Sequence, residues 1–393
     1  MKIVVDDKIP YIRETLALLA DEVVYKKGAD ISADDVRDAD ALIVRTRTRC
    51  DEQLLGGSSV QLVATATIGY DHLDTQWLEQ QGIAWTNCPG CNSGSVAQYI
   101  ESTLLLLMEN LEWRMENYDN QTSACGSLAS NHNSQLSTLH SQLTLGVVGC
   151  GHVGRKVCRV GERLGMRVLV NDPPLERALI ENGEWRMENY DDQTSACGSL
   201  ASNHNSPFSI LNSQLPFPFV SLETIEREAD IITFHVPLDA TTRHLADEEF
   251  FTRLQRQPVV INSSRGGVVD EQALLRAMDS GRVRQAVIDT WENEPDINRV
   301  LLNKVYIGTP HIAGYSADGK VNADNMVVAV LCRHFGLPQP ARIKAPSLPA
   351  GFRYTGDPLQ LYNPLDDSRR LKENPGSFEE LRGNYPLRRE REV

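Results

Sequence analysis

Apolar residues in the first part of the chain form short runs that alternate with a stretch of helical spacing. A buried parallel strand appears as an uninterrupted apolar run, whereas a helix repeats apolar residues about every three or four positions. Their alternation predicts a parallel α/β domain. The predicted strands are residues 3–5, 41–44, 62–66 and 83–85, and a helix is predicted near residues 11–20.

The same alternation resumes after a long predicted helix at residues 95–108. A second α/β domain is therefore expected, joined to the first by that helix. A later helix, at residues 323–335, is placed to return the chain to the first domain. The strands predicted for the second domain are residues 145–148, 168–171, 231–234, 259–262, 286–289 and 305–307.

A glycine-rich turn follows the predicted strand at residues 145–148 and precedes a stretch of helical spacing. In a dinucleotide-binding fold, the first glycine permits the tight bend, the second lets the backbone approach the pyrophosphate, and the third lets helix and strand pack closely. The helix N-terminus then offers N–H groups to the phosphates. The open alternative is a purely structural turn. The candidate cofactor-binding residues here are Gly149, Gly151, His152, Val153 and Gly154, with Cys150 after the first glycine.

The next predicted strand leads to Asp172, whose carboxylate can accept hydrogen bonds from the ribose hydroxyls of adenosine. A 2′-phosphate would be repelled by this charge, and Pro173 and Pro174 follow where an arginine would be needed. The sequence therefore predicts NAD as the cofactor. The alternative for Asp172 is an ordinary surface aspartate.

Arg265 follows the predicted strand at residues 259–262, at the carboxyl end where open α/β sheets bind ligands. A guanidinium can hold a carboxylate with two parallel hydrogen bonds while its other donors polarise the oxygen that is oxidised. Arg265 is thus a candidate catalytic residue, the alternative being a surface ion pair. Ser263 and Ser264, which precede it, are candidates for cofactor binding.

His311 and Glu294 each follow a predicted strand, at residues 305–307 and 286–289. Loops from neighbouring strand ends meet, so these two side chains are expected to lie together. An imidazole is suited to accept a hydroxyl proton and return it at cellular pH, and a carboxylate beside it would orient the ring. His311 is the candidate acid/base and Glu294 its partner. Packing or capping is expected of His72, His235 and His244.

The charge of the chain restricts its ligands. Its 393 residues are 41% hydrophobic and 23% charged, as in ordinary globular proteins, with a formal net charge of −14. This argues against general binding to nucleic acid or membrane surfaces, so an anionic ligand needs a local basic cluster. Arg45, Arg47 and Arg49, after the predicted strand at residues 41–44, are candidates for such a cluster. Alternate residues of an extended segment face opposite sides. The alternative that all three arginines are only solvated side chains of a loop therefore stays open.

The N-terminal residues are expected to form a strand rather than a leader, and no apolar stretch approaches membrane-spanning length. A cytoplasmic location is expected. The 8 cysteines show no disulfide-framework spacing. Cys88 and Cys91 form a single C-x-x-C, which is interpreted as a loop feature, and no metal site is predicted.

An internal repeat interrupts the second domain. Residues 112–143 recur as residues 184–215, with 27 of 32 aligned positions identical. Stacked repeats need adjacent units that share an apolar face, whereas these copies are separated by the glycine turn and are rich in Asn, Ser and Gln. They are interpreted as two copies of an inserted low-complexity segment forming mobile surface loops, with Trp113 and Trp185 unpacked. A partner-binding or mutually pairing element is the alternative.

Together, these motifs resemble the D-isomer-specific 2-hydroxyacid dehydrogenases, and apart from the repeats the resemblance covers most of the chain. The order that carries it is the glycine turn, Asp172, Asn262-Ser263-Ser264-Arg265-Gly266, Asp289-Thr290-Trp291-Glu292-Asn293-Glu294-Pro295 and Thr309-Pro310-His311-Ile312-Ala313-Gly314.

The resemblance implies an NAD-dependent oxidation of a small phosphorylated D-2-hydroxy acid. It gives Arg265, Glu294 and His311 the catalytic roles. Thr46, Thr67 and Tyr315 stand at substrate-contacting positions. Asp172, Val236, Asp289 and Gly314 stand at NAD-contacting positions.

The resemblance also implies a division into domains. Residues 1–94 with 312–337 would be the substrate-binding lid, and residues 95–311 the Rossmann-like NAD-binding domain, carrying insertions at 112–143 and 184–215. Residues 338–393 resemble a shortened dimerisation region, so a homodimer is expected.

Two rival functions stay open. One is a sibling dehydrogenase acting on another D-2-hydroxy acid, of the phosphoglycerate or glycerate type. The other is a non-catalytic NAD-binding scaffold, suggested by the repeats. The second copy begins 12 residues after Asp172, where it could hinder the adenosine side of the cleft.

Overall fold

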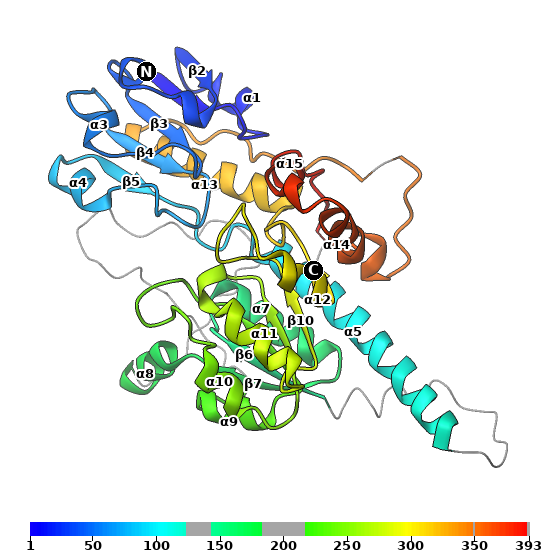
Figure 1. Ribbon diagram of the computed structural model, residues 1–393. Coiled ribbons are helices and arrows are strands. Elements are labelled where there is room, and N and C mark those ends of the chain that lie inside the picture. Colours follow the sequence, from blue (N-terminus) through cyan, green and yellow to red (C-terminus); the bar gives the residue numbers. More distant parts are fainter. Residues whose placement is uncertain (123–142, 183–216, 349, 391–393) are drawn as a thin grey trace. The chain divides into compact units, whose positions relative to one another are not determined.

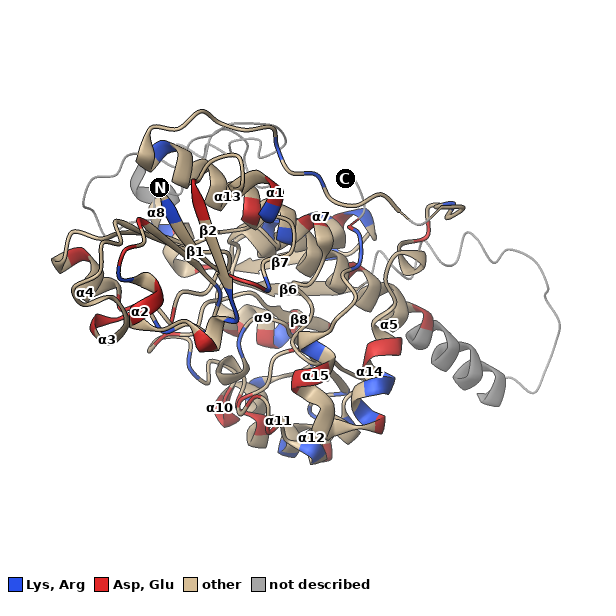
Figure 2. Cartoon of the chain, turned by 90° about the horizontal axis from the view of Figure 1, so that it is seen from above, with Lys and Arg blue, Asp and Glu red and all other residues tan. Residues whose placement is uncertain are grey.

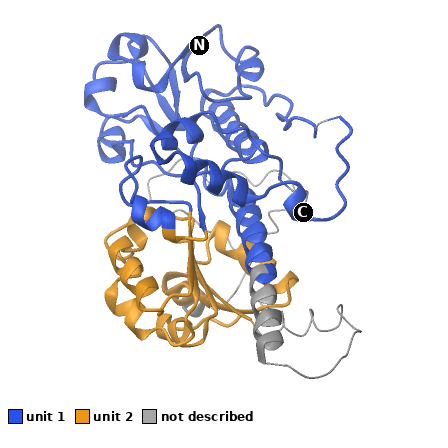
Figure 3. Cartoon of the chain, turned by 45° about the vertical axis from the view of Figure 1, so that its right-hand side comes forward, with its two compact units in different colours: residues 1–127, 289–303, 307–393 blue, residues 128–288, 304–306 orange. Residues whose placement is uncertain are grey.

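A computed structural model describes residues 1–122, 143–182, 217–348 and 350–390, with no side-chain description for residues 110–122 and 179–182. The chain divides into two compact units, coloured separately in Figure 3. Unit 1 comprises Met1–Ser127, Asp289–Asn303 and Ile307–Val393, and unit 2 comprises Leu128–Ile288 and Lys304–Tyr306.

Unit 1 is built on a parallel sheet with the strand order β2-β1-β3-β4-β5 (Figure 1). The central strands are buried on both faces, which explains their uninterrupted apolar sequences. Edge strand β2 is mostly half-buried, and its mixed sequence gave no apolar run to predict it. The strands are β1 (Lys2–Asp6), β2 (Glu22–Lys26), β3 (Ala41–Val44), β4 (Leu62–Thr65) and β5 (Ala84–Thr86).

Helices cover both faces of this sheet. On one face Ile3, Val5 and Ile43 pack with Leu16 of α1 and Val327 of α13. On the other face lie apolar residues of α2, α3 and α4. The alternation of side chains along each strand produces these two cores. The helices are α1 (Arg13–Leu16), α2 (Ala33–Val36), α3 (Glu52–Leu55), α4 (Thr75–Gln80) and α13 (Ala317–Phe335).

The remaining helices of unit 1 come from distant parts of the chain. They are α5 (Ser93–Thr122), α12 (Arg299–Lys304, whose last residue belongs to unit 2), α14 (Pro364–Glu373) and α15 (Phe378–Gly383). Helix α5 packs against both α13 and α14. Through α14, the C-terminal part of the chain joins the same compact unit as the N-terminal sheet.

The second sheet has the strand order β11-β10-β9-β8-β6-β7, and its strands from β10 to β7, all in unit 2, pair in parallel. Within unit 2, a Cβ on Gly161 of α7 would meet Leu145, whereas a Cβ on Gly146 would meet Ile225 of α9. Since Leu145 and Gly146 are consecutive in β6, α7 and α9 cover opposite faces. The strands are β6 (Thr144–Val148), β7 (Arg167–Asn171), β8 (Ile231–Phe234), β9 (Val259–Asn262), β10 (Gln285–Ile288) and β11 (Ile307–Gly308).

Helices connect the strands of unit 2. They are α7 (His152–Arg163), α8 (Pro173–Asn182), α9 (Leu222–Glu228), α10 (Glu248–Arg253) and α11 (Glu271–Asp279). Acidic and basic residues both occur along the helices (Figure 2). No helix in the described ranges has the length and apolar character needed to cross a membrane.

The structure confirms the predicted architecture of two parallel-sheet α/β domains. The predicted helix at residues 11–20 is shorter, spanning Arg13–Leu16, and the helix predicted at residues 95–108 is longer. That helix, α5, runs through the first eleven residues of the first repeat copy, to Thr122. Most of both copies, with the side chains of Trp113 and Trp185, lies outside the described residues. The division into lid, NAD-binding and dimerisation regions stays a prediction.

Candidate active site

His311 and Glu294, which the sequence predicted to lie together, are in direct contact within unit 1. Nδ1 of His311 lies 2.8 Å from Oε2 and 3.0 Å from Oε1 of Glu294. A carboxylate can only accept, so the facing Nδ1 carries the proton and donates it. In the neutral imidazole the lone pair is then on Nε2, which has no hydrogen-bond partner among the described residues. The arrangement suits a base that takes up a proton at Nε2.

Further groups hold the Glu294 carboxylate in place. The backbone N–H of Trp291 donates to Oε1 over 3.0 Å, and Nη1 of Arg382 lies 3.5 Å from Oε2. Burial alone would raise the pKa of Glu294. The opposing effects outweigh burial and lower this pKa: they are the hydrogen bond and charge of His311, the N–H of Trp291 and the charge of Arg382. The carboxylate therefore stays ionised against the imidazole.

Asp289 holds the loop that carries His311. Its Oδ1 accepts from the hydroxyl of Thr309 at 2.7 Å and from the N–H of Ile312 at 2.8 Å, and its Oδ2 accepts from the N–H of Ala313 at 3.0 Å. The side chain is buried, and burial raises its pKa against these hydrogen bonds and the charge of His311. The sequence placed Asp289 at an NAD-contacting position, whereas the contacts that the structure gives its carboxylate are all with this loop.

Arg388 holds the same loop from its carbonyl side. Its guanidinium donates to the carbonyl oxygens of Ile312 at 3.0 Å, of Tyr315 at 2.9 Å and of Ala313 at 2.5 Å. It also donates to the Ser95 carbonyl and lies over the Tyr362 ring. Five donors in a fixed fork make this multiple contact possible. The loop at residues 309–315 is thus bound by Asp289 through its N–H groups and by Arg388 through its carbonyls.

Tyr315 is the centre of a basic cluster in unit 1. Nε of Arg382 donates to its hydroxyl over 3.3 Å, and Nζ of Lys320 lies 4.4 Å from the ring centroid. Burial would raise the pKa of Tyr315, but the charges of Lys320, Arg382 and Arg45 lower it. Sequence reasoning did not identify Lys320 or Arg382 as site residues. Lys320 lies in the first turns of α13 and Arg382 in α15, and neither helix carries a motif that marks it.

The other predicted substrate and cofactor positions of unit 1 differ in their surroundings. Thr46 is exposed in a turn after β3. The hydroxyl of Thr67 donates to the Gly69 carbonyl at 2.9 Å and lies 2.7 Å from the hydroxyl of Thr65. A Cβ on Gly314 would lie 2.2 Å from Nδ2 of Asn92, so the absence of a side chain allows this close approach.

Arg265 lies in unit 2, directly after β9, as predicted. Asn262 shapes its loop, because its amide donates to the Arg265 carbonyl at 2.9 Å and its oxygen accepts from the hydroxyl of Ser264 at 2.9 Å. The guanidinium is half-buried and donates to the Ser264 carbonyl. The hydroxyl of Ser263 is buried without a hydrogen-bond partner among the described residues, so it is available to bind a ligand.

The glycine turn of unit 2 fits a dinucleotide. Gly149 has φ +91°, and a Cβ on Gly154 would lie 2.0 Å from the Gly149 carbonyl oxygen, so both positions require glycine. A Cβ on Gly151 would meet nothing within 4 Å, and no side chain caps the N-terminus of α7. Open space therefore lies beside Gly151, at the uncapped start of α7, where a pyrophosphate binds in such folds.

The remaining cofactor positions of unit 2 lie at the ends of neighbouring strands. Asp172 follows β7, and its carboxylate accepts from the N–H groups of Cys150 at 2.7 Å and Leu175 at 3.0 Å. Each carboxylate oxygen has a second acceptor site for a ribose hydroxyl. Val236 is half-buried after β8. Next to it, burial lowers the pKa of His235 to about 3, so that histidine has a packing role.

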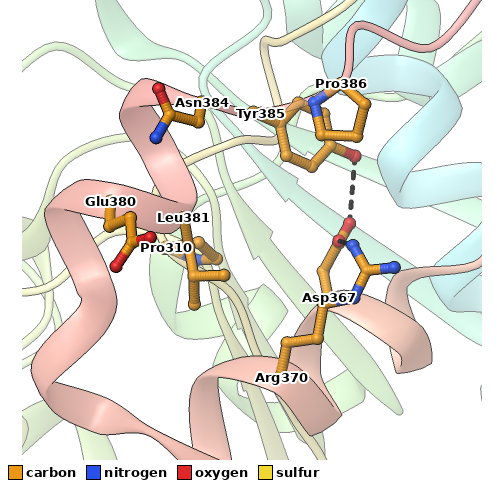
Figure 4. A pocket seen from close by; sticks show the side chains of 8 residues that line it. All are labelled: Pro310, Asp367, Arg370, Glu380, Leu381, Asn384, Tyr385 and Pro386. Atoms are coloured by element: carbon orange, nitrogen blue, oxygen red, sulfur yellow. Dashed lines mark hydrogen bonds and ion pairs between the residues drawn. The ribbon is translucent and has the colours of Figure 1, made fainter.

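A cavity of about 160 Å³ lies beside the C-terminal helices of unit 1 (Figure 4). The side chains of Asp367 and Tyr385 are joined across it by a hydrogen bond of 3.0 Å. Pro310 links the cavity to the His311 loop, but neither His311 nor Glu294 lines it. It is thus separate from the reacting groups. Its lining residues are Pro310, Asp367, Arg370, Glu380, Leu381, Asn384, Tyr385 and Pro386.

The described site residues thus form two sets. Unit 1 contains the contacting pair His311 and Glu294, with Tyr315 joined to Glu294 through Arg382. Unit 2 contains Arg265 and the glycine turn.

Comparison with known proteins shows which sequences this chain is similar to. The profile of the D-isomer specific 2-hydroxyacid dehydrogenase, NAD binding domain, matches residues 105–203 and 200–313. The chain is 46% identical over 398 residues to erythronate-4-phosphate dehydrogenase of Bacteroides thetaiotaomicron, covering 99% of this chain and 97% of that protein. It is 34% identical to the enzyme of the same name from Klebsiella pneumoniae, over 99% of this chain and 92% of that protein.

Solved structures share the fold. D-lactate dehydrogenase from Aquifex aeolicus, complexed with NAD and lactic acid, aligns with a TM-score of 0.60 and 23% identity, over 86% of this chain and 96% of that one. A D-isomer specific 2-hydroxyacid dehydrogenase from Lactobacillus delbrueckii aligns with a TM-score of 0.58 and 20% identity, over 88% of this chain and 100% of that one.

Replacing Arg388 by lysine tests its hold on the 309–315 loop. Lysine keeps the charge but lacks the planar fork, so several buried carbonyls lose their donor. We expect Arg388→Lys to lower the free energy of unfolding by about 3 kcal/mol or more, since hydrogen bonds to charged groups contribute roughly 1.5–3 kcal/mol each. Urea denaturation measures the change. Arg369→Lys is the control, because Arg369 forms an exposed ion pair with Asp366. Equal stability of the two variants would contradict this role.

The buried Asp324 beside the basic cluster predicts a pH dependence of stability. Burial raises its pKa to about 7, against the Tyr11 N–H and the charges of Lys320 and Arg45. Between the unfolded and folded pKa values the folded state binds more protons, so stability falls as the pH rises. We expect the ionisation of Asp324 to lower the free energy of unfolding by roughly 2–3 kcal/mol between about pH 5 and about pH 8. The free energy of unfolding, measured by urea denaturation at both pH values, should fall less in Asp324→Asn than in the wild type. Equal falls in the two proteins would refute the role given to Asp324.

Proposed function

This chain belongs to the D-isomer specific 2-hydroxyacid dehydrogenase family, and within it we propose that the protein oxidises 4-phospho-D-erythronate with NAD. The product would be (R)-3-hydroxy-2-oxo-4-phosphooxybutanoate, an intermediate of pyridoxal 5′-phosphate (vitamin B6) biosynthesis. The observation that carries the proposal is the contact between His311 and Glu294 in a chain that also has Arg265 after β9 and the open glycine turn. Relatives named erythronate-4-phosphate dehydrogenase, at up to 46% identity, support the choice of substrate.

In this reaction the side chains of the protein move one proton and bind the substrate. Nε2 of His311 accepts the proton of the C2 hydroxyl, and Glu294 stabilises the imidazolium that forms. Arg265 holds the carboxylate and polarises the hydroxyl oxygen as it becomes a carbonyl. NAD, when bound, supplies the acceptor for the hydride that leaves C2. The proton and the hydride together account for the two hydrogens lost by the alcohol.

The proposed cofactor site uses the residues at the strand ends of unit 2 and two residues of unit 1. Open space beside Gly151 supports a pyrophosphate there, and the buried, unpartnered hydroxyl of Ser263 supports a ligand contact beside Arg265. Thr46, Thr67 and Tyr315 are proposed to contact the substrate. The proposed cofactor residues are Gly149, Gly151, His152, Val153, Gly154, Asp172, Val236, Ser263, Ser264, Asp289 and Gly314.

Two rival activities are separated by a substrate panel. A phosphoglycerate- or glycerate-type enzyme would prefer those acids to 4-phospho-D-erythronate when NADH formation is followed. A non-catalytic scaffold would bind NAD in calorimetry without turning over any D-2-hydroxy acid or reducing the corresponding 2-oxo acids. Preference for 4-phospho-D-erythronate supports the proposal.

Variants of the reacting groups test the mechanism. We expect His311→Ala and Arg265→Ala to lower kcat/KM by at least about a hundredfold, the scale of losing an acid/base group, while NAD binding stays nearly unchanged. Initial rates and calorimetry with NAD measure the two quantities. His334→Ala on α13, outside the proposed site, is the control histidine. Wild-type kcat/KM in His311→Ala would mean that another group is the base.

We also propose that the protein works as a cytoplasmic homodimer. Leu348 and Phe352, in the C-terminal region that resembles a dimerisation domain, are 39% and 38% exposed, and we propose that they lie at the contact between subunits. Light scattering should give twice the mass of one chain. The double variant Leu348→Ser with Phe352→Ser should shift the mass towards the monomer. A wild-type protein with the mass of one chain would disprove the dimer.

A further inference from the structure

The three arginines that follow β3 have different surroundings. Arg47 pairs with Glu379, and Nε of Arg49 lies 2.8 Å from Asp51. Both side chains are mainly exposed, at 60% and 74%. Arg45 is instead half-buried and has no carboxylate partner among the described residues. Arg45 therefore differs from Arg47 and Arg49 both in its burial and in having no carboxylate partner in the described part of the chain.

The Arg45 guanidinium has hydrogen-bond donors that no described residue accepts. Its Nη1 donates to the Lys8 carbonyl over 2.9 Å, which fixes the guanidinium at one end. The other N–H groups have no acceptor in the described part of the chain. The segment that it contacts also binds α13, because the N–H of Tyr11 donates to the Asp324 carboxylate over 3.1 Å. The charge of Arg45 contributes to lowering the pKa of Tyr315 and of Lys320. A fixed guanidinium with free donors is ready to bind an anion.

Lys320 is a second cation, and it lies beside Tyr315. Its ammonium lies 4.4 Å from the centroid of the Tyr315 ring and donates no hydrogen bond to any described residue. The side chain is only half-accessible, and burial together with the Arg45 charge lowers its pKa against the opposing effects of Tyr315 and Asp324. A partly buried ammonium without acceptors is costly unless an anion completes its surroundings.

Lys320 is linked to the proposed reacting groups of unit 1. Tyr315 contacts Lys320 through its ring and Arg382 through its hydroxyl, and Arg382 lies 3.5 Å from the Glu294 carboxylate that orients His311. Arg382 is thus already engaged by an acid, whereas Arg45 and Lys320 are not. Tyr315 and Arg382 therefore connect Lys320 to the pair of Glu294 and His311.

We propose that Arg45 and Lys320 form the phosphate-binding subsite of the substrate, beside Tyr315. The inference rests on the proposed function and states which residues select a phosphorylated hydroxy acid. In 4-phospho-D-erythronate the phosphorus is four bonds from the C2 that reacts, so a short substrate reaches both groups. A phosphate carries about −1.5 to −2 charges and three acceptor oxygens, which match two cations with unused donors. An acidic chain needs such a local field to hold it.

Kinetics with and without the phosphate test the subsite. Initial rates would be measured for Arg45→Met and Lys320→Met with 4-phospho-D-erythronate and with D-erythronate. We expect each variant to lose roughly tenfold to a hundredfold in kcat/KM for the phosphorylated acid, the scale of one charge-assisted contact. The value for D-erythronate should change by less than about threefold, because that acid lacks the group concerned. Lys320→Arg should recover part of the loss.

Arg49→Met is the matched control, since it removes an exposed arginine of the same segment that pairs with Asp51. It should leave kcat/KM unchanged for both acids. Equal losses for both acids in Arg45→Met and Lys320→Met, or no loss for either, would overturn the proposal. Arg45→Met keeps the test decisive if Lys320→Met fails to fold.

Phosphate binding separates failure of the subsite from failure of the proposed function. If the wild type oxidises neither acid, the proposed reaction is wrong. Calorimetry with inorganic phosphate, in the presence of NAD, then decides the subsite alone. Binding by the wild type that is lost in Arg45→Met and Lys320→Met supports the subsite. Absent binding, or equal binding by wild type and variants, refutes it.

Discussion

The geometry of the active site depends on two buried charges that bind one short stretch of backbone. Asp289 accepts from the N–H groups of Ile312 and Ala313, and Arg388 donates to the carbonyls of the same two residues. A loop without regular secondary structure has peptide groups that need partners when they are buried. Here opposite charges supply them from opposite sides. His311, which has φ +56°, is held in an uncommon backbone conformation next to this stretch.

The C-terminal part of the chain contributes to the active site. Besides Arg388, it supplies Arg382 to the Glu294 carboxylate, and Oε1 of Glu390 accepts from the hydroxyls of Ser95 and Ser316. Ser95 lies at the start of α5 and Ser316 caps α13, so the segment connects elements that are more than two hundred residues apart. A region expected only to pair subunits therefore also contacts Glu294 and the loop that carries His311, the groups of the proposed active site.

The sequence predicted those features that a local pattern encodes. Continuous apolar runs identified the central strands, and glycine spacing identified the turn before α7. The pairing of His311 with Glu294 followed from their places after neighbouring strands. The roles of Lys320, Arg382 and Arg388 depend on contacts between residues far apart in sequence, which no periodicity records. Asp289 shows the same limit, since its partners are fixed by a fold that the motif alone does not describe.

The separation of site residues between the two units has an evolutionary consequence. Recognition of the dinucleotide and of the carboxylate common to all 2-hydroxy acids would fall mainly to residues of unit 2, whereas the groups around Tyr315 belong to unit 1. If the proposed assignments hold, a change of preferred acid would require substitutions after β3 and at the start of α13, and the coenzyme-binding residues of unit 2 could stay the same.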